Sequence, residues 1–184
     1  SVHHLVEMRE RADREATTAA VERIVARLVE TNVEPLVPAG GMNVVGATRY
    51  AESAAEVVGV DGRLSQTRTG IRHNAGVRSG VGSDLAHQLL AAREAFPTLR
   101  FAATCRLDDA VEQALDTLDG VAVRGSAASA TDVVATALDD ADAAPTAIID
   151  AGGADRQPAV IVVAPTAATL RKRLVGLHEA LITE

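Results

Sequence analysis

Aromatic side chains are almost missing from this 184-residue sequence. It has no tryptophan, one tyrosine (Tyr50) and two phenylalanines (Phe96 and Phe101), so aromatic residues make up only 2% of the chain. Single-stranded nucleic acid is usually held by stacking its bases on aromatic rings, and that mode of binding is not expected here. Apolar residues still make up 47%, which is enough for a packed domain with an aliphatic core.

Positive charge is scarce as well. The chain has 18 lysines and arginines against 25 aspartates and glutamates, which gives a net charge of −7. Lys172 is the only lysine, so the other basic residues are all arginines. Binding to a phosphate backbone requires a basic face, and we therefore predict that the protein has no nucleic-acid partner.

Cysteine and long apolar runs are also rare. Cys105 is the only cysteine, so no internal disulfide can form, which favours a reducing compartment. No apolar run is long enough to cross a bilayer, and His3, His4 and Glu7 interrupt the apolar segment that a signal peptide would need. We therefore predict a cytoplasmic protein with no membrane partner.

The first part of the chain is predicted to be helical. Apolar residues recur at roughly helical spacing over residues 5–29, but the register drifts around residues 15–18, which indicates a tail followed by one helix over residues 18–31. Pro35, Pro38 and the pair Gly40-Gly41 end this pattern. We therefore place a boundary between a segment 1–34 and a single domain over residues 35–184, a size that suits one hydrophobic core.

Beyond residue 40, short strands and helices alternate, which predicts an α/β domain. The turn Asp61-Gly62 separates two extended runs, and Ser83 is a good first residue for an amphipathic helix. The expected strands cover residues 42–47, 57–60, 63–67, 71–78, 99–104, 121–123, 146–149 and 159–163. The expected helices cover residues 83–95, 107–118, 131–138 and 166–182, with a short helix or loop over 51–58.

Three glycine-rich turns are candidate anion sites. Gly40-Gly41, Gly80-Val81-Gly82 and Gly152-Gly153 would let the backbone approach a ligand closely, and the middle turn leads into a helix N-terminus. The arginines at positions 63, 68, 72 and 78 surround this region and suit bidentate phosphate contacts. The alternative is that these are ordinary turns and solvated arginines, because short glycine motifs are weak signals.

The residue pattern indicates no metal site and no defined nucleophile. The five histidines are not spaced as metal ligands with carboxylates or with Cys105. Cys105 beside Arg106 could be an activated thiolate, but it continues the apolar run Leu99, Phe101, Ala103, and a buried inert thiol is the alternative.

Several segments, in chain order, resemble the ThiN-type thiamine-phosphate synthase domain. The likeness covers residues 35–182 and rests on the collinear order of motifs that are individually weak. The segments are Leu36-Val37-Pro38, Met42-Asn43-Val44-Val45, Val57-Val58-Gly59-Val60-Asp61-Gly62-Arg63, Gly80-Val81-Gly82-Ser83-Asp84, Cys105-Arg106-Leu107 and Asp150-Ala151-Gly152-Gly153 followed by Pro158.

The resemblance implies a fold and a reaction. The fold is a three-layer α/β/α domain with a mixed, largely antiparallel sheet, similar to class II aldolases and epimerases. The reaction joins hydroxymethylpyrimidine diphosphate to thiazole phosphate, releases pyrophosphate and uses Mg²⁺ on the diphosphate. Carried over to this chain, the catalytic positions are Arg106 and Asp84, and the ligand-binding positions are Met42, Asn43, Arg63, Gly80, Gly82, Ser83, Asp150, Gly152 and Gly153.

One departure from the family pattern bears on activity. Catalytic members carry a histidine at the position of Asp84, and a carboxylate in the first turn of a helix repels a diphosphate. The sequence therefore leaves two hypotheses: an active synthase, or a degenerate domain that senses thiamine phosphates. Regulation through DNA and a homodimerisation domain are further alternatives.

The N-terminal segment and the composition carry two more resemblances. Residues 1–14 are similar to the end of hydroxymethylpyrimidine-phosphate kinase domains that are fused to a ThiN domain, which implies a fused kinase as partner. The acidic, lysine-poor composition resembles that of proteins from halophilic archaea, in which abundant carboxylates keep the surface solvated.

Overall fold

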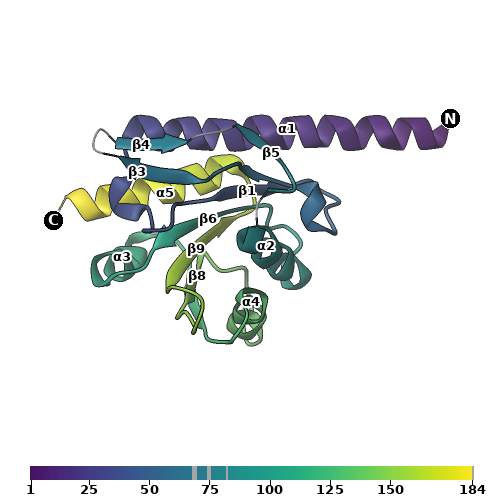
Figure 1. The fold of residues 1–184 in the computed structure, drawn as a ribbon. Helices are drawn as coiled ribbons and strands as arrows, with labels where there is room; N and C mark the ends of the chain where they lie inside the picture. The colour runs from purple at the N-terminus through teal and green to yellow at the C-terminus, as the bar shows by residue number, and fades with distance from the viewer. Residues whose placement is uncertain (68–69, 74–75, 82, 184) are drawn as a thin grey trace.

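The protein is described here by a computed structural model that covers residues 1–67, 70–73, 76–81 and 83–183 (Figure 1). The helices are α1 (Val2–Thr31), α2 (Ser83–Ala95), α3 (Asp109–Ala114), α4 (Ala130–Leu138) and α5 (Ala167–Ile182). The strands are β1 (Val44–Ala47), β2 (Val57–Val60), β3 (Leu64–Thr67), β4 (Gly70–His73), β5 (Val77–Ser79), β6 (Phe101–Arg106), β7 (Ala122–Gly125), β8 (Ala147–Asp150) and β9 (Ala159–Ala164). Short 3₁₀ turns cover Glu34–Leu36, Ala54–Glu56 and Leu115–Thr117.

The main sheet is mixed and largely antiparallel, as predicted. In the described part of the chain its strand order is β5-β2-β1-β6-β9-β8-β7. Each neighbouring pair is antiparallel except β7 and β8. Strands β3 and β4 form a separate hairpin that lies alongside α1 (Figure 1). Helices cover both faces of the main sheet, so the predicted three-layer α/β class is confirmed.

Each face of the sheet has its own core. α1 and α5 cover one face, and α2 and α4 cover the other (Figure 1). Strand β6 shows how the alternation of a strand supplies both cores: Phe101, Ala103 and Cys105 face the α1 side, whereas Ala102 faces the α2 side. At Gly46 of β1 a Cβ would lie 2.7 Å from the Phe101 ring, so the sheet can meet α1 this closely only with glycine there.

Helix α1 is one continuous element rather than a tail and a shorter helix. Its buried residues all lie in its second half, between Thr17 and Leu28, whereas its N-terminal end projects beyond the sheet (Figure 1). The exposed half is helical because it extends a helix that the buried half has already nucleated. Asn32, in the left-handed conformation at φ 56°, ends the helix and donates its N–H to the carbonyls of Leu28 and Val29.

Local predictions differ from the structure mainly between residues 51 and 79. The single strand expected over 71–78 is two strands, β4 and β5, which belong to different sheets. The short helix or loop expected over 51–58 is a 3₁₀ turn followed by β2. The predicted turn Asp61-Gly62 is confirmed, with Gly62 at φ 80°, and it leads from the main sheet to the β3–β4 hairpin.

Two broader expectations can be compared with the fold. No helix among the described residues is long and apolar enough to cross a membrane. The expected boundary between residues 34 and 35 stays a prediction. In the structure, Val21, Ile24 and Leu28 of the preceding segment are fully or almost fully buried in the core.

Candidate functional site

A cavity of about 340 Å³ opens at one end of the main sheet, on the face covered by α2 and α4. Its walls come from the loop that precedes β1, the residue that precedes β3, the first turns of α2, the ends of β6 and β8, the loop that leads into β9, and the start of β9. The lining residues are Pro38, Gly40, Gly41, Asn43, Arg63, Asp84, Leu85, Gln88, Thr104, Asp150, Asp155, Arg156, Gln157, Pro158, Ala159 and Ile161.

The floor of the cavity is polar because it is formed by the parts of the strands that extend beyond the apolar core under α2 and α4. Further along the same face, Val45, Ala102 and Ile148 belong to the core beneath α2 and α4. Two residues further along each strand, and on the same face, Thr104 follows Ala102 on β6 and Asp150 follows Ile148 on β8. Both line the cavity. The end of the sheet that the helices leave open is therefore the end that carries hydrogen-bonding side chains.

Asn43 lies on the floor and joins two strands. Its Oδ1 accepts the N–H of Val60 at 3.1 Å and its Nδ2 lies 3.5 Å from the carbonyl of Val60. Asn43 is 5% exposed, and its amide extends the pairing of β1 with β2 by one more position. The side chain therefore fixes the shape of the floor as well as presenting a polar surface to the cavity.

Arg63 enters the cavity from a strained backbone position. Its φ is 63°, in the left-handed region that costs a residue with a Cβ about 1 kcal/mol or more. The guanidinium Nη1 donates to the carbonyl of Gly40 at 3.3 Å. Gly41, at φ 95°, lies so close that a Cβ there would be 3.2 Å from the Arg63 Cβ and 3.0 Å from the Leu64 carbonyl oxygen. These glycines therefore leave the space in which Arg63 sits.

Asp150 and Arg156 form a two-point ion pair at the opposite wall. The Arg156 Nε lies 2.7 Å from Asp150 Oδ2, and its Nη2 lies 3.0 Å from Oδ1. Arg156 also donates to the carbonyls of Ala127 and Ala128, and Asp150 Oδ1 accepts the N–H of Gly152 at 2.8 Å. The pair therefore holds the loop before β9 against the segment that starts α4. The bond to Asp150 raises the pKa of Arg156.

The first two turns of α2 form the third wall. Asp84 and Gln88 lie one helical turn apart and so face the cavity together. Gln88 is buried and donates its amide to the Ala130 carbonyl at 3.2 Å, which ties α2 to the start of α4. Asp84 is exposed at the cavity and lies close enough to Arg156 to raise its pKa further.

The comparison with protein families decides the identity of the domain. The family model described as thiamine-phosphate synthase ThiN matches residues 20–175. The chain belongs to the thiamine-phosphate synthase ThiN family. This membership confirms the resemblance at the level of the domain and connects the chain to thiamine biosynthesis. No curated protein matches the chain by sequence.

Solved structures show the same fold at low sequence identity. The C-terminal domain of a phosphomethylpyrimidine kinase superposes with a TM-score of 0.82 and 18% identity, covering 88% of this chain and 98% of that one. L-fuculose-1-phosphate aldolase from Thermus thermophilus gives 0.52 and 13%, covering 91% of each chain. An aldolase II superfamily protein from Pseudomonas syringae gives 0.51 and 10%, covering 91% of this chain and 75% of that one. These likenesses concern the fold alone, and they agree with the expected class II aldolase-like architecture.

The ThiN domain brings four of the residues carried over from the family resemblance to one cavity: Asn43, Arg63, Asp84 and Asp150. The candidate turn Gly40-Gly41 lines the same cavity. Other predicted residues are not among those that line it. Gly152, at φ 85°, and Gly153 form the turn that follows Asp150, and Gly80, at φ 79°, follows β5 and donates its N–H to the carbonyl of Val57. Gly82 lies outside the described residues, and Ser83 is the first residue of α2.

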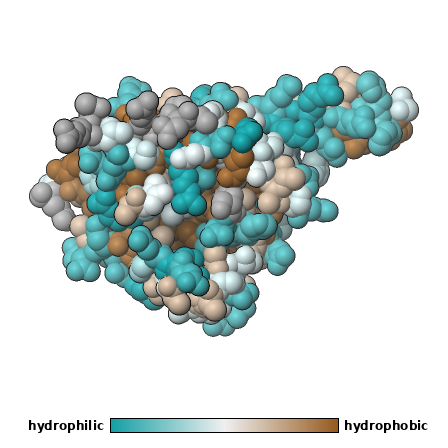
Figure 2. Space-filling model, in the orientation of Figure 1, coloured by the Kyte–Doolittle hydropathy of each residue, from teal (hydrophilic) through white to brown (hydrophobic). Residues whose placement is uncertain are grey.

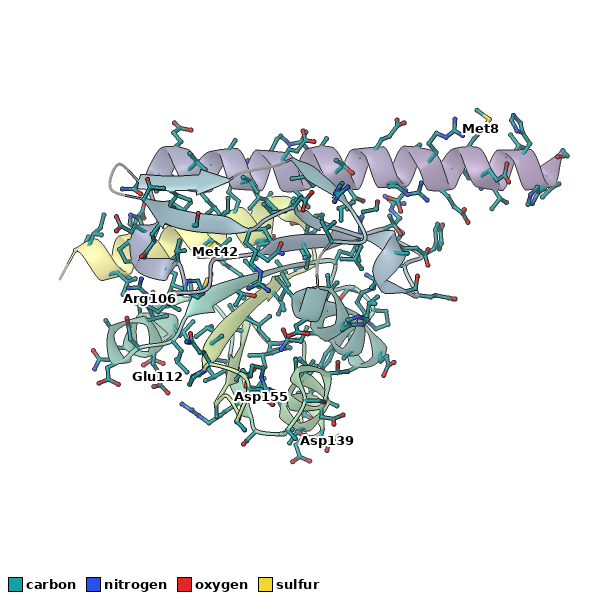
Figure 3. The ribbon with its side chains drawn as sticks, in the orientation of Figure 1. Met8, Met42, Arg106, Glu112, Asp139 and Asp155 are labelled. Atoms are coloured by element: carbon teal, nitrogen blue, oxygen red, sulfur yellow. The ribbon has the colours of Figure 1, made fainter. Side chains whose placement is uncertain are left out.

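Met42 and Arg106 also lie outside the cavity lining, and each has a structural role. Met42 is fully buried and exchanges two backbone hydrogen bonds of 2.7 Å with Leu64, so it anchors the hairpin. Arg106, two residues beyond Thr104 on β6, donates its Nε and Nη2 to the carbonyl of Val37 at 3.1 and 2.9 Å. Figure 3 shows Arg106 toward α3 and Asp155 in the loop before β9. Arg106 thus supports the segment that leads into the cavity rim.

Sequence reasoning missed three lining residues for which a signal existed. Thr104 is a polar residue inside an apolar strand, Gln88 lies at helical spacing from Asp84, and Arg156 follows Asp150 across a glycine turn. Each signal is weak alone, because the closing contacts come from distant parts of the chain.

The described residues contain no cluster of three or more histidine, cysteine, aspartate or glutamate side chains that could hold a metal by themselves. Cys105 is fully buried, and burial raises the pKa of its thiol to about 12. The interpretation of Cys105 as an inert core residue is therefore confirmed.

Proposed function

We propose that this domain condenses hydroxymethylpyrimidine diphosphate with thiazole phosphate in the cavity described above. The observation that carries the proposal is the convergence of Arg63, the α2 N-terminus and a polar strand-end floor on one cavity in a chain of the ThiN family. Its volume of about 340 Å³ falls in the range of roughly 300–1,000 Å³ that is typical of small-molecule sites.

The lining residues would have three roles in binding: contact with phosphate, exclusion of water and support of the wall. Arg63 donates one hydrogen bond to the Gly40 carbonyl and retains further N–H groups for a phosphate, while the N-terminus of α2 favours negative charge. Leu85, Pro158 and Ile161 supply apolar wall, which would keep water from the cation-like methylene carbon of the pyrimidine as pyrophosphate leaves. Arg156 is already bonded to Asp150, so its main contribution would be to hold the wall in place.

The expected Mg²⁺ fits this lining as a companion of the diphosphate. Asp84 and Asp155 both line the cavity, and Mg²⁺ is commonly held by one or two carboxylates together with substrate phosphates. When bound, the ion would neutralise charge on the departing pyrophosphate. Asp150 is engaged by Arg156 and Gly152 and is not needed as a ligand.

A second candidate function is favoured by the charge of the lining. Three carboxylates (Asp84, Asp150, Asp155) face two arginines (Arg63, Arg156), so the lining carries one net negative charge. A monophosphate ligand tolerates this better than a diphosphate does. In this candidate function the domain binds thiamine phosphate as a sensor for a fused phosphomethylpyrimidine kinase.

One experiment separates the two candidates. The purified chain would be incubated with both substrates and Mg²⁺, and pyrophosphate release would be measured beside calorimetric binding of thiamine phosphate. Turnover that is lost in Arg63→Gln supports the synthase, with exposed Arg171→Gln as the matched control. Binding of thiamine phosphate without turnover supports the sensor, and absence of both contradicts the placement of the site.

The Asp84→His variant tests the departure from the family pattern. If Asp84 limits catalysis, this variant should release pyrophosphate faster than the parent chain. If Asp84 instead helps to hold Mg²⁺, the variant should need a higher Mg²⁺ concentration for the same rate.

A further inference from the structure

A cluster of three arginines lies at the other end of the strands and of the helix that form the cavity. We refer to Arg49, Arg93 and Arg100 as the arginine cluster. Arg49 follows the end of β1, Arg93 lies in the last turns of α2, and Arg100 precedes β6. The cavity, by contrast, takes its residues from before β1, from the first turns of α2 and from the last residues of β6.

Hydrogen bonds between these segments hold the cluster together. Arg93 donates to the carbonyl of Leu99 at 2.7 Å and to the carbonyl of Arg49 at 3.0 Å. Arg100 donates to the carbonyl of Ala47 at 3.1 Å and to the Thr17 hydroxyl at 3.1 Å. Each guanidinium has five N–H groups, so both Arg93 and Arg100 keep donors beyond these contacts.

The positive charge of the cluster is only partly balanced. Asp13 lies beside it, with Oδ1 3.7 Å from Arg100 Nη2, which is too long for a hydrogen bond. Asp13 Oδ2 accepts the backbone N–H of Arg49 at 2.7 Å. Among the described residues, the Arg49 guanidinium has no hydrogen-bond or ion-pair partner. One carboxylate therefore faces three guanidinium groups.

Nearby carboxylates do not complete the balance. Glu10 and Glu56 line a small crevice next to Asp13. Glu56, however, accepts hydrogen bonds from the N–H of Glu52 and the hydroxyl of Ser53, both at 3.3 Å, so it serves its own loop. Glu10 is exposed to solvent.

Burial first, and repulsion between the guanidinium groups second, act on the pKa values of the cluster. Burial and the charge of Arg100 lower the pKa of Arg93, while burial and the charge of Arg49 lower the pKa of Arg100. Asp13 opposes both shifts but does not cancel them. An added anion would relieve this repulsion.

We propose that the arginine cluster is a second binding site for a phosphate-type oxyanion, separate from the cavity. Arg93 and Arg100 are fixed by backbone carbonyls and keep unused N–H donors, while exposed Arg49 can close over the bound anion. The site accepts inorganic phosphate, pyrophosphate or a phosphate monoester. It does not depend on the reaction proposed for the cavity, although α2 connects the two places.

The test uses the whole 184-residue chain and NMR signals of the arginine Nε–H groups. Phosphate and, separately, pyrophosphate are titrated at constant ionic strength with chloride as the balancing anion. The Arg93 and Arg100 signals should shift with a saturating curve, and Arg49→Gln should weaken the affinity about fivefold to tenfold, as expected for one lost charge-assisted contact. Arg49→Lys should weaken it less.

Two controls keep this result specific. Arg171→Gln removes one exposed arginine of α5 and should leave the affinity unchanged. Arg63→Gln should leave the response of the cluster unchanged, which separates it from the cavity. The proposal is wrong if the Arg93 and Arg100 signals do not shift, if Arg49→Gln binds as the parent chain does, or if Arg171→Gln weakens binding equally.

Discussion

The carboxylate of Asp150 and the guanidinium of Arg156 meet through two hydrogen bonds, of 2.7 and 3.0 Å, at a wall of the cavity. The Asp150 side chain is 3% exposed and that of Arg156 is 17% exposed, so the pair is largely shielded from water. Because β8 ends at Asp150 and β9 begins shortly after Arg156, the pair fixes the loop between two adjacent strands.

Replacing Arg156 should therefore be costly for stability. Arg156→Met would leave the Asp150 carboxylate buried without its main partner, and breaking a buried pair in this way costs about 3–5 kcal/mol. We expect a loss near the lower figure, because the Gly152 N–H still bonds to Asp150. Urea unfolding measures the change, and Arg171→Met on the surface is the control. A loss no larger than that of the control would show that the pair is not a structural support.

Gly46 should tolerate no larger residue. In Gly46→Ala the new Cβ would lie 2.7 Å from the Phe101 ring and 2.9 Å from a Val21 methyl group, so α1 would have to move away from the sheet. Overpacking of this kind costs about 1–3 kcal/mol, measurable by thermal or urea unfolding. Gly76→Ala is the matched control, because its Cβ meets nothing within 4 Å. Equal stability of the two variants would contradict the close packing of α1.

The buried histidine of α5 should make stability depend on pH. His178 is 6% exposed and its Nδ1 has no hydrogen-bond partner among the described residues. Burial lowers its pKa below the usual value of 6.5, and Glu179 opposes this only in part. The unfolded chain therefore binds more protons at this position just below pH 6.5, so the contribution of neutral His178 to stability is lost as the pH falls from about 7 toward the folded pKa.

The variant that checks this effect is His178→Leu. Urea unfolding of both proteins at several pH values between about 5 and 8 should show a smaller fall in stability for the variant on the acid side. Parallel pH profiles for the two proteins would mean that other groups cause the acid destabilisation.

Cys105 should not react with thiol reagents in the folded protein. Its thiol is fully buried, and its pKa of about 12 leaves almost no thiolate near neutral pH. A colorimetric disulfide reagent at pH 8 should label no thiol in the native state and one in denaturant, because the chain has a single cysteine. Rapid labelling of the native protein would indicate that the strand opens locally at β6.

Much of the fold follows from local patterns, and the exceptions have identifiable causes. The apolar run before Arg106 and the capping residues Asp108 and Thr166 mark their elements directly, because strand alternation and helix caps depend on neighbouring residues. The division of residues 70–79 between two sheets could not be predicted, because it depends on which distant strands pair with each half.

The same distinction applies to the candidate site. Asn43, Arg63, Asp84 and Asp150 were found through motif order, and all four line the cavity. The ion pair with Arg156 was not predicted, because its contribution to stability depends on burial and on the carbonyls of Ala127 and Ala128, which are far away in the sequence. The roles assigned to Arg106 and Asp84 stay predictions.

The projecting N-terminal part of α1 makes the domain sensitive to force applied far from its core. The helical residues 2–9, which precede the first contacts of α1 with the body, span about 12 Å. A continuous helix transmits bending along its axis as a stiff rod does. In Figure 2 this arm extends clear of the body of the molecule. A sideways load near Val2 would bend α1 about its first contacts with the body, where Asp13 accepts the backbone N–H of Arg49. A small displacement at this contact would be transmitted along β1, because this strand connects Asn43, on the floor of the cavity, with the segment that carries Arg49.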